Sequence, residues 1–591
     1  MDIRRISPFI SVSPQLSPQD VSIAASQGFK AIINNRPDRE GEAQPLSAEV
    51  EAAAKRAGLA YRHIPVVSGR LTDADVARFQ AATDELMGPV LAFCRTGTRS
   101  ATLWALSQAH RLDPAAILEA CSEAGYDLSS IETRLATRAR AAAVSAGTDN
   151  VVAIERARHH QVVIVGGGSG GIATAASLLR RRPDLDIVII EPRDRHFYQP
   201  GWTLVGGGVF DRAQTTRPMA DVMPKGVTWI RTAVAGFAPD RNEVVLDDGG
   251  RLGYAVLIVA PGLKLDWDRI DGLSETLGKN GVTSNYLFDM APYTWELVQE
   301  LRTGTALFTQ PPMPIKCAGA PQKAMYLACD HWLRTGRIKG IEVGFYNAGG
   351  VLFGVPDYVP ALSGYVQRYG ADLNFGHDLV AVDGATKTAQ FEIRKDDGAV
   401  ETVERRFDML HVCPPQTAPD FVRSSGLAND AGWVDVDPDT LQHTKFGNVF
   451  GLGDACSAPN AKTAAAVRKQ APVVAINALA VLDGHAPRGL YDGYGSCPLT
   501  VERGRIVLAE FGYGGKLAPT FPTWLIDGTK PSRLAWLLKE KLLPDIYWRL
   551  MLKGREWLAG PTVLPHPPTP HEEQEACDFK DPPTARGTSA P

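Results

Sequence analysis

One residue with clear chemical potential is Cys317, in the segment FTQPPMPIKCAGAPQKAMY, residues 308–326. It directly follows Lys316 and precedes a run of small residues. A neighbouring ammonium group favours the thiolate, which is the nucleophilic form of cysteine. The segment therefore predicts a reactive thiol.

A second cysteine suited to redox chemistry is Cys456, which comes two residues after Asp454 in GNVFGLGDACSAPNAKTAAAVRKQ. Both cysteines follow strand-like segments, and the carboxyl ends of parallel strands face one crevice. In a reducing compartment, a disulfide between Cys317 and Cys456 would be redox-active rather than structural. The alternative is that both are buried fillers, because free cysteine is among the most buried residue types.

A third thiol, Cys94, lies in VLAFCRTGTRSATLWAL with Arg95, Gly97, Arg99 and Ser100. A loop of backbone N–H groups before a helix, with two arginines, makes an anion cradle and lowers a thiol pKa. Cysteine phosphatases use Cys-x5-Arg, whereas the loop here is Cys-x4-Arg and resembles the persulfide-carrying loop of rhodaneses. A smaller ring of N–H groups suits a sulfur anion, so we favour sulfur transfer and keep phosphatase as the alternative.

A dinucleotide site is indicated by VVIVGGGSGGIATAASLL, an apolar strand followed by Gly166, Gly168, Gly171 and a small-residue helix. Gly166 permits a tight turn, Gly168 lets the backbone approach a pyrophosphate, and Gly171 allows close packing of helix and strand. Glu191 follows the next apolar strand, where its carboxylate can accept a hydrogen bond from a ribose hydroxyl.

The identity of the dinucleotide depends on Asp454, which ends a second apolar segment before another helix. Flavoproteins with two dinucleotide domains use such a residue to bond the ribityl chain, so FAD is favoured over NAD; an ordinary Gly-Asp loop is the alternative. Residues 308–326 carry Cys317 where such proteins have a second glycine-rich loop. Electrons should therefore enter through sulfur rather than from NAD(P)H.

These residues must be positioned by α/β domains, because apolar strand-like segments alternate with amphipathic helical ones. At 591 residues the chain is long enough for about three or four domains. We expect an α/β domain over 1–140, a linker over 141–159, two Rossmann-like subdomains over 160–485 and a C-terminal region over 486–560. The Pro-rich segment 561–591 is predicted to be disordered.

Composition excludes several classes of protein. The net charge of −4 gives no case for nucleic-acid binding, and no apolar run reaches the length of a spanning helix. The N-terminus does not have the pattern of a signal peptide, and eight scattered cysteines do not form a disulfide framework. The histidines show no metal-ligand spacing, so we expect no metal.

The segment 531–558 mixes Leu, Trp and Tyr with more basic than acidic residues. That pattern is typical of amphipathic helices lying in the headgroup region of a bilayer. The alternative is a helix packed on the protein's own core.

Residues from about 160 to 557 resemble the sulfide:quinone oxidoreductase family, in its mitochondrial branch. The resemblance is carried by EPRDRHFYQPGWTLVGGGVF, KCAGAPQKAMYLACDHW, MLHVCPPQ, GWVDVDPDTLQH, GNVFGLGDACSAPNAKTAAAV, YDGYGSCPL and YWRLMLKG. It implies a Rossmann-type flavoprotein with bound FAD and C-terminal helices that dock on a membrane. It also implies sulfide and quinone as substrates, at the cytoplasmic side of the inner membrane.

The resemblance places one catalytic cysteine at Cys317 and the other directly after Gly-Asp, where this chain has Ala455. The thiol comes one residue later, at Cys456, and Cys413 is a possible substitute. Sulfide would attack the disulfide and leave a persulfide, two electrons would pass to FAD, and a small thiol or sulfite would remove the sulfane sulfur. Residues implied to line FAD are Ser169, Gly170, Glu191, Gln199 and Val234, the last near the adenine. We add Lys462, whose charge could stabilise reduced flavin.

The N-terminal segments ISPFISVSPQLSPQDV and FKAIINNRPDREGE are similar to a phosphatase-like family often fused to sulfur enzymes. Cys94 could then accept sulfane sulfur from the flavoprotein. Two alternatives remain: an NAD(P)H-dependent FAD oxidoreductase, such as an NADH:quinone reductase, fused to a tyrosine-phosphatase-like domain, or a sulfurtransferase or phosphatase with a degenerate flavin domain as scaffold.

Overall fold

The computed structural model divides into two compact units, Met1–Glu155 and Arg156–Pro591. Most of the predicted linker 141–159 and of the predicted tail 561–591 lies outside the described residues, although strand β6 begins at Arg158, inside that linker. The residues that the structure describes are 2–7, 9–41, 44–86, 88–109, 114–138, 158–394 and 398–565.

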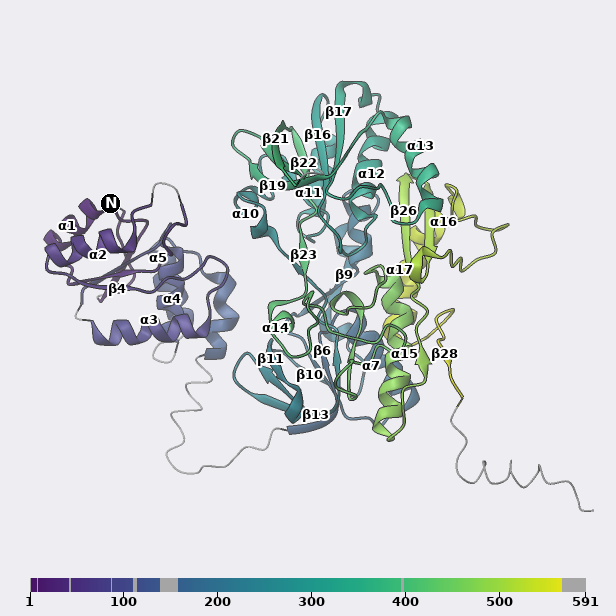
Figure 1. Ribbon diagram of the computed structural model, residues 1–591, viewed down its shortest axis with the longest axis horizontal. Coiled ribbons are helices and arrows are strands. Elements are labelled where there is room, and N and C mark those ends of the chain that lie inside the picture. The colour runs from purple at the N-terminus through teal and green to yellow at the C-terminus, as the bar shows by residue number, and fades with distance from the viewer. Residues whose placement is uncertain are drawn as a thin grey trace, which may run out of the picture. The chain divides into compact units, whose positions relative to one another are not determined.

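The N-terminal unit contains a five-stranded sheet in the order β1-β2-β5-β3-β4 (Figure 1). Only β1 is antiparallel to its neighbour. One apolar cluster lies on each face of the sheet, under α1 and α2 on one side and under α3, α4 and α5 on the other. The strands are β1 (Arg4–Arg5), β2 (Ile10–Ser13), β3 (Ala31–Asn34), β4 (Ala60–His63) and β5 (Val90–Phe93), and the helices are α1 (Pro18–Ser26), α2 (Ser47–Arg56), α3 (Asp73–Glu85), α4 (Thr98–Gln108) and α5 (Pro114–Glu123).

Local sequence explains several of these elements. Ser17 and Thr72 cap α1 and α3, each accepting a hydrogen bond from a backbone N–H of the first turn, which satisfies a donor that the helix itself leaves free. The strands predicted in FKAIINNRP and PVLAFC are confirmed as β3 and β5, and both are fully buried.

The first sheet of the larger unit has the order β10-β7-β6-β13-β12-β11, with β24 paired to β13. Strands β10, β7, β6, β13 and β24 are parallel. The apolar runs of β7, β13 and β24 are buried, as is usual in parallel sheets whose two faces are covered, whereas β10 at the edge is mostly half-buried. Helices α7 and α15 pack against each other. The elements are β6 (Arg158–Val165), β7 (Ile187–Ile190), β10 (Val227–Ile230), β11 (Val234–Ala238), β12 (Glu243–Leu246), β13 (Arg251–Val259), β24 (Val449–Gly451), α7 (Ser169–Arg181) and α15 (Ala464–Leu482).

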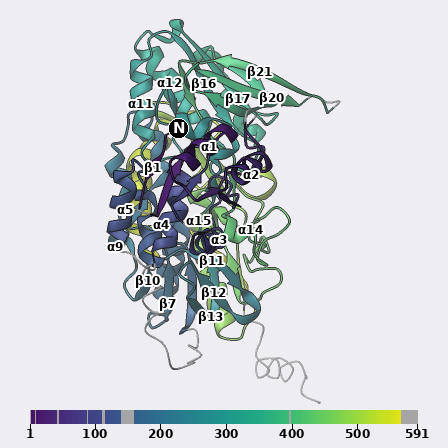
Figure 2. The same cartoon turned by 90° about the vertical axis from the view of Figure 1, so that its left-hand side faces the viewer.

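A second, wholly parallel sheet has the order β15-β22-β16-β17-β18. An antiparallel group, β19-β20-β21, adjoins it, and Figure 2 shows β20 and β21 reaching outward as a hairpin. The elements are β15 (Val282–Thr283), β16 (Gly304–Gln310), β17 (Ile341–Asn347), β18 (Asp372–Phe375), β19 (His377–Asp383), β20 (Thr388–Arg394), β21 (Val400–Arg406), β22 (Met409–His411), α11 (Ala291–Glu300), α12 (Ala320–Arg334) and α13 (Val359–Tyr369).

The C-terminal region begins with the antiparallel pair β26 (Gly495–Glu502) and β27 (Arg505–Phe511), and β26 packs on α12. A helical stretch follows, built of α16 (Arg533–Leu537), η10 (Leu538–Leu542), α17 (Leu543–Asp545), η11 (Ile546–Leu550) and η12 (Met551–Lys553). The shorter elements are β8 (Arg195–Phe197), β9 (Thr216–Pro218), β14 (Lys264–Leu265), β23 (Gln416–Thr417), β25 (Gly489–Leu490), β28 (Thr562–Val563), α8 (Trp202–Val205), α9 (Met219–Val222), α10 (Leu273–Thr276) and α14 (Asp420–Arg423).

Among the described residues, α15 alone has the length and apolar composition that would allow it to cross a bilayer. The apolar stretch of this helix is 61% buried inside the protein. Because it packs against α7 beside the first sheet, its apolar character is that of a core helix.

Candidate functional site

The glycine-rich loop after β6 has the geometry that its sequence predicts. Gly166 has a φ of +102°, a conformation that favours glycine, and a Cβ there would collide with the carbonyl oxygen of Ala260. A Cβ on Gly171 would collide with the carbonyl oxygen of Gly166. Beside Gly168 there is no heavy atom within 4 Å of the Cβ position, so the loop has open space where a phosphate group needs to approach.

The start of α7 and the end of β7 complete this cradle. Helix α7 begins at Ser169 without a side-chain cap, so no side chain competes for the N–H groups of its first turn. Gly170 is packed against the Ala260 side chain. The Glu191 carboxylate accepts hydrogen bonds from the backbone N–H groups of Gly167 (2.8 Å) and Arg193 (3.0 Å). The residues fit a dinucleotide, with N–H donors for its pyrophosphate and a fixed acid for a ribose.

Two further predicted cofactor residues lie at different points of the large unit. Val234 is the first residue of β11 and is buried in the core of the first sheet. Gln199 begins a short 3-10 turn after β8, and its Oε1 accepts a hydrogen bond from Lys316 Nζ at 2.7 Å. The residue before Cys317 is therefore tied to the loop that carries Gln199.

Asp454 and Lys462 occupy the loop between β24 and α15. Burial raises the pKa of the Asp454 carboxyl, and the charges of Lys316 and Lys462 oppose that effect. Lys462 Nζ donates to the carbonyl oxygens of Asp454 (2.8 Å) and Cys456 (2.9 Å) and lies 3.9 Å from the centroid of the Trp433 ring. The Lys462 ammonium thus stabilises the conformation of its own loop. This structural role differs from the predicted stabilisation of reduced flavin.

Cys317 is held in a tight turn just before α12. Its φ is +53°, in the left-handed region that residues with a Cβ seldom occupy. Its N–H donates to the carbonyl of Lys462 at 2.8 Å, and its own carbonyl accepts from Ala320 at 2.7 Å. A strained residue held by such bonds at a reactive position is a common feature of functional sites.

The thiol that the structure places beside Cys317 is Cys497, from β26. The two side chains lie close enough to shift each other's pKa. Gly319 makes the approach possible, because a Cβ there would collide with the Leu499 side chain on β26. The turn that carries Cys317 therefore lies directly against the strand that carries Cys497.

Two buried lysines complete the sulfur site. Lys323, one turn into α12, donates from Nζ to Cys317 Sγ at 3.0 Å. Lys539, in η10, donates to the carbonyl of Pro498 (3.1 Å) and to Thr500 Oγ1 (3.0 Å) on β26. Burial and the neighbouring Lys323 charge hold the pKa of Lys539 well below its usual value.

These neighbours separate the two thiols in acidity. The hydrogen bond from Cys497 holds the pKa of Cys317 well below the ordinary thiol value, and the Lys323 ammonium adds to this effect against the opposing effect of burial. The pKa of Cys497 is raised by the same hydrogen bond and by burial. The pair thus combines one thiolate with one neutral thiol, and the charge of Cys317 raises the pKa of Lys323 against the effect of burial.

The predicted partner of Cys317 needs correction, because the structure does not bring Cys456 to it. Cys456 is fully buried in the core of the first sheet, and its thiol donates to the carbonyl of Gly453 at 3.3 Å. Cys413 packs in the same small cluster as Cys317, but burial raises its pKa to about 12, which disfavours its thiolate.

Sequence reasoning assigned no role to Cys497, Lys323 or Lys539. Cys497 and Lys323 do stand in the family-like stretches YDGYGSCPL and KCAGAPQKAMYLACDHW, which is the signal that pointed to them. Lys539 has no such signal, since it comes from a helix whose basic residues were predicted to face a membrane.

The Cys94 loop forms a separate site at the carboxyl end of β5. Cys94 Sγ accepts a hydrogen bond from Gly97 N–H at 3.1 Å. Arg99 donates to the carbonyl of Val66 (2.6 Å) and to Glu40 (2.7 Å), and Arg36 donates to the same Glu40 oxygen (2.6 Å). Although burial opposes it, these arginines lower the pKa of Glu40. Arg99 is thus held in place by a carboxylate, one loop N–H contacts the Cys94 thiol, and Arg95 is exposed.

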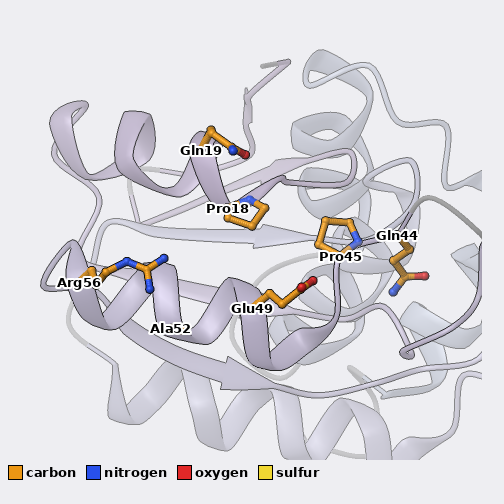
Figure 3. Close-up of a pocket in the computed structure, with 7 residues that line it drawn as sticks. All are labelled: Pro18, Gln19, Gln44, Pro45, Glu49, Ala52 and Arg56. Carbon is orange, nitrogen blue, oxygen red and sulfur yellow. The ribbon is translucent and has the colours of Figure 1, made fainter.

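A hollow of about 560 Å³ lies elsewhere on the N-terminal unit, between α1 and α2 (Figure 3). Pro18, Glu49 and Arg56 are among the residues that line it, and none of the lining residues belongs to the Cys94 loop. Within the described ranges, no group of His, Cys, Asp or Glu could hold a metal ion.

Comparison with protein-family models gives two matches. Residues 2–111 match the phosphatase-like domain of the beta-lactamase hydrolase-like protein, and residues 160–289 match pyridine nucleotide-disulphide oxidoreductase. The predicted fold class, a phosphatase-like α/β domain followed by a Rossmann-type flavoprotein, is confirmed. The second match implies a flavin-type cofactor.

Three known proteins illustrate the similarity. The mitochondrial sulfide:quinone oxidoreductase of Dictyostelium discoideum is 42% identical over 382 residues, 64% of this chain and 82% of that protein. The beta-lactamase hydrolase-like protein of Xylella fastidiosa is 41% identical over 108 residues, 18% of this chain and only 25% of that protein. The structure of sulfide:quinone oxidoreductase from Aquifex aeolicus has a TM-score of 0.53 and 20% identity, covering 73% of this chain and 100% of that one, and shows the shared fold.

Proposed function

The chain belongs to the sulfide:quinone oxidoreductase family, and we propose that its larger unit oxidises sulfide through the Cys317–Cys497 pair, with FAD as cofactor and quinone as final acceptor. The observation that supports this most directly is the pairing itself, two neighbouring thiols beside Lys323. Two adjacent thiols can form and break a disulfide, which is two-electron chemistry.

The reaction begins with the disulfide form of the pair. HS⁻ attacks the sulfur of Cys497 and the S–S bond breaks, which leaves a persulfide on Cys497 and releases Cys317 as a thiolate. Cys317 is the better leaving group because its pKa is the lower of the two. Lys323 holds the resulting negative charge through the bond from its Nζ to Cys317 Sγ.

A small nucleophile, such as a thiol or sulfite, then attacks the outer sulfur of the persulfide and leaves Cys497 as a thiol. The reduced pair now holds the two electrons that were removed from sulfide. Bound FAD would supply a two-electron acceptor, and a quinone could then reoxidise the flavin. The glycine loop, Glu191 and Asp454 would hold the cofactor, and Gln199 fixes Lys316 by accepting a hydrogen bond from its Nζ.

This proposal is tested by the colour of the purified protein. We expect a yellow, flavin-containing protein that bleaches when sulfide is added anaerobically and regains its colour with a soluble quinone. NADH should leave the absorbance unchanged. Bleaching by NADH without any response to sulfide would instead support the alternative, an NADH:quinone reductase.

We further propose that the C-terminal region docks the enzyme peripherally on the cytoplasmic side of the inner membrane, where quinone resides. Its inner face is packed, since Trp536, Tyr547 and Trp548 are buried. Its outer face exposes apolar side chains, and Trp524, in the preceding loop, is 83% exposed. Leu525, Leu534, Leu537 and Leu542 are among its other exposed apolar residues.

Vesicle co-sedimentation tests this docking. Changing Leu534 and Leu537 to Gln removes apolar area worth about 1.5–3 kcal/mol per fully buried side chain, so binding to vesicles of anionic lipid should fall at least tenfold. Val351→Gln, at a 61% exposed residue outside this region, is the control. Equal binding of all variants would contradict docking through this face.

For the N-terminal unit we propose sulfur transfer through Cys94, supported by the Gly97 N–H that holds Cys94 Sγ. Cys94→Ser should abolish sulfur transfer from thiosulfate to cyanide, and it should slow sulfur turnover by the whole chain while sulfide still bleaches the flavin. Hydrolysis of p-nitrophenyl phosphate that depends on Cys94, without sulfur transfer, would favour the phosphatase alternative.

A further inference from the structure

Tyr126 is fixed in place beside the Cys94 loop. Gly125, with a φ of +81°, adopts the left-handed conformation that commonly ends a helix, here α5. The Tyr126 N–H donates back to the carbonyl of Cys121 at 2.8 Å. The Arg4 guanidinium lies 5.3 Å from the centroid of the Tyr126 ring and donates to the Gly125 carbonyl. The ring therefore has a single, supported orientation.

The hydroxyl of Tyr126 is directed at this loop. The residue is 6% exposed, and its hydroxyl is one of the buried polar atoms that have no hydrogen-bond partner within the described part of the chain. The atom that a Cβ on Gly97 would meet first is this hydroxyl oxygen. Gly97 is also the residue whose N–H donates to Cys94 Sγ, so an unpaired donor stands beside the reactive sulfur.

A buried hydroxyl without a partner destabilises a fold, so its position suggests that a ligand completes it. Burial raises the pKa of Tyr126, and a nearby Cys94 thiolate adds to this effect while Arg4 opposes it. The phenol accordingly remains protonated and serves as a hydrogen-bond donor. Sulfur in a persulfide anion is an acceptor that Cys94 itself would carry.

We propose that Tyr126 is a catalytic residue of the Cys94 site, whose hydroxyl donates a hydrogen bond to the outer sulfur of a Cys94 persulfide. This inference rests on the sulfur-transfer function proposed above. Within it, the backbone N–H of Gly97 serves the inner sulfur and Tyr126 serves the outer one.

The ligand class follows from the charges at the loop. The guanidinium groups of Arg36 and Arg99 share the single carboxylate of Glu40, and the exposed Arg95 follows Cys94 directly, so positive charges outnumber negative ones among these residues. That balance suits small anionic donors of sulfane sulfur, of which thiosulfate is the simplest.

The transfer balances without an added oxidant. The Cys94 thiolate attacks the outer sulfur of thiosulfate, the S–S bond of thiosulfate breaks, and sulfite leaves with the electron pair. Cyanide or a thiolate then attacks the outer sulfur of the persulfide anion, and Cys94 leaves as a thiolate. Tyr126 keeps its proton throughout.

The test is Tyr126→Phe in the full chain, assayed for sulfur transfer from thiosulfate to cyanide. Loss of a hydrogen bond to a charged sulfur should lower kcat about tenfold or more. Thermal unfolding should be unchanged or shifted upward, because the missing hydroxyl had no partner. The amount of cyanide-releasable sulfur that stays bound to Cys94 after removal of thiosulfate should also fall.

A matched control is Tyr61→Phe in the same unit. The Tyr61 hydroxyl is hydrogen-bonded to Asn34 (3.0 Å) and to Ser47 (2.9 Å), so its removal should lower stability while sulfur transfer stays within about twofold. If Tyr126→Phe behaves like this control, with lower stability and unchanged transfer, the inference is overturned.

Cys94→Ser separates the inference from the function on which it rests. If Cys94→Ser keeps the transfer activity, the proposed function fails. If Cys94→Ser abolishes transfer while Tyr126→Phe stays within twofold of the wild type, only the role of Tyr126 fails.

Discussion

Cys94 and Cys317 have similar local settings and different neighbours. Each stands in a loop just before a helix, α4 or α12. The Cys94 thiol accepts a hydrogen bond from the Gly97 N–H, whereas Cys317 has a second thiol and a buried lysine beside it. The neighbours, rather than the placement of the thiol, distinguish the two sites, and they fit the proposed roles of a sulfur carrier and a redox pair.

The two sites also draw on different ranges of the chain. The donor to Cys94 Sγ is three residues away, at Gly97. Cys317 depends on Cys497 and Lys539, from a strand and a helix far along the chain. The comparison therefore predicts that the Cys317 site is sensitive to changes in elements far along the chain, whereas the Cys94 site draws on nearby elements of the N-terminal unit, such as those that carry Glu40 and Tyr126.

The largest expected effect comes from removing the partner thiol. Cys497→Ser should lower the rate of flavin reduction by sulfide about a thousandfold or more, in the range seen when a covalent catalytic group is lost. Stopped-flow absorbance of the bound flavin measures it. Cys456→Ser is the control and should stay within about twofold. If instead Cys456→Ser loses the reaction and Cys497→Ser keeps it, the two-thiol site is elsewhere.

Removing the Lys323 ammonium should have the next largest effect. Lys323→Met deprives the Cys317 thiolate of its cation, so the pKa of Cys317 should rise and the reaction at pH 7 should slow about ten- to a hundredfold. Thiolate absorbance at 240 nm, followed against pH in the reduced enzyme, reports the pKa. Lys339→Met, at an exposed lysine, should leave it unchanged.

We expect Lys323→Met also to change how the free energy of unfolding depends on pH. A group whose pKa is lowered by folding contributes stability that is complete above its unfolded pKa and is lost as pH falls through its folded pKa. For reduced wild-type enzyme, the Cys317 contribution is thus present above the ordinary thiol pKa and declines below it. Lys323→Met should flatten that decline in urea unfolding curves, and an unchanged curve would argue against the ion pair.

A smaller effect is expected at the contact that brings the two thiols together. Gly319→Ala places a Cβ against Leu499, and overpacking of this kind costs about 1–3 kcal/mol in the free energy of unfolding. Urea unfolding measures the cost. Gly364→Ala, in α13 with no atom within 4 Å of the Cβ position, should be neutral or slightly stabilising because alanine favours helices. If the two variants have the same free energy of unfolding, β26 does not pack closely against the turn that carries Cys317.

The smallest effect should come from the carboxylate at the Cys94 loop. Glu40→Gln weakens the partly exposed pairs with Arg36 and Arg99, so we expect a loss of about 1 kcal/mol in unfolding free energy. Folding lowers the pKa of Glu40. The difference in unfolding free energy between the wild type and Glu40→Gln should therefore have its full size above about pH 4.3, and it should become smaller as pH falls through the folded pKa. Flavin reduction by sulfide should not change. Glu51→Gln, at an exposed pair with Lys55, is the control, and an equal loss there would remove any special role for Glu40.

Several features of the fold and the sites were predictable from local sequence. The roles of Gly166 and Gly171 follow from the spacing of the glycines, because each contact involves the turn or the adjacent strand. The Cys94 loop is equally local, since Cys94 and Gly97 are three residues apart. The strands β3 and β5 followed from continuous apolar runs with turn residues at their ends.

The partner of Cys317 was not predictable in this way. Cys456 follows a strand end and lies near Asp454 in sequence, yet a 3-10 turn at Gly453–Ala455 directs its thiol into the core. Cys497 lies on a strand of a different sheet, and no sequence pattern predicts that this strand packs against α12. A one-dimensional pattern cannot specify which two elements pack together when both are apolar.

The sequence by itself predicted the chemical groups of this protein: a dinucleotide loop, a thiol before α12, and a thiol loop near the N-terminus. Each prediction depended on residue types and spacings within one short segment. Only the tertiary structure decided that Cys317 pairs with Cys497 and that Lys323 and Lys539 lie beside them. The physical reason is that a buried site is assembled from non-local packing, and the Gly319–Leu499 contact exists only once α12 and β26 have come together.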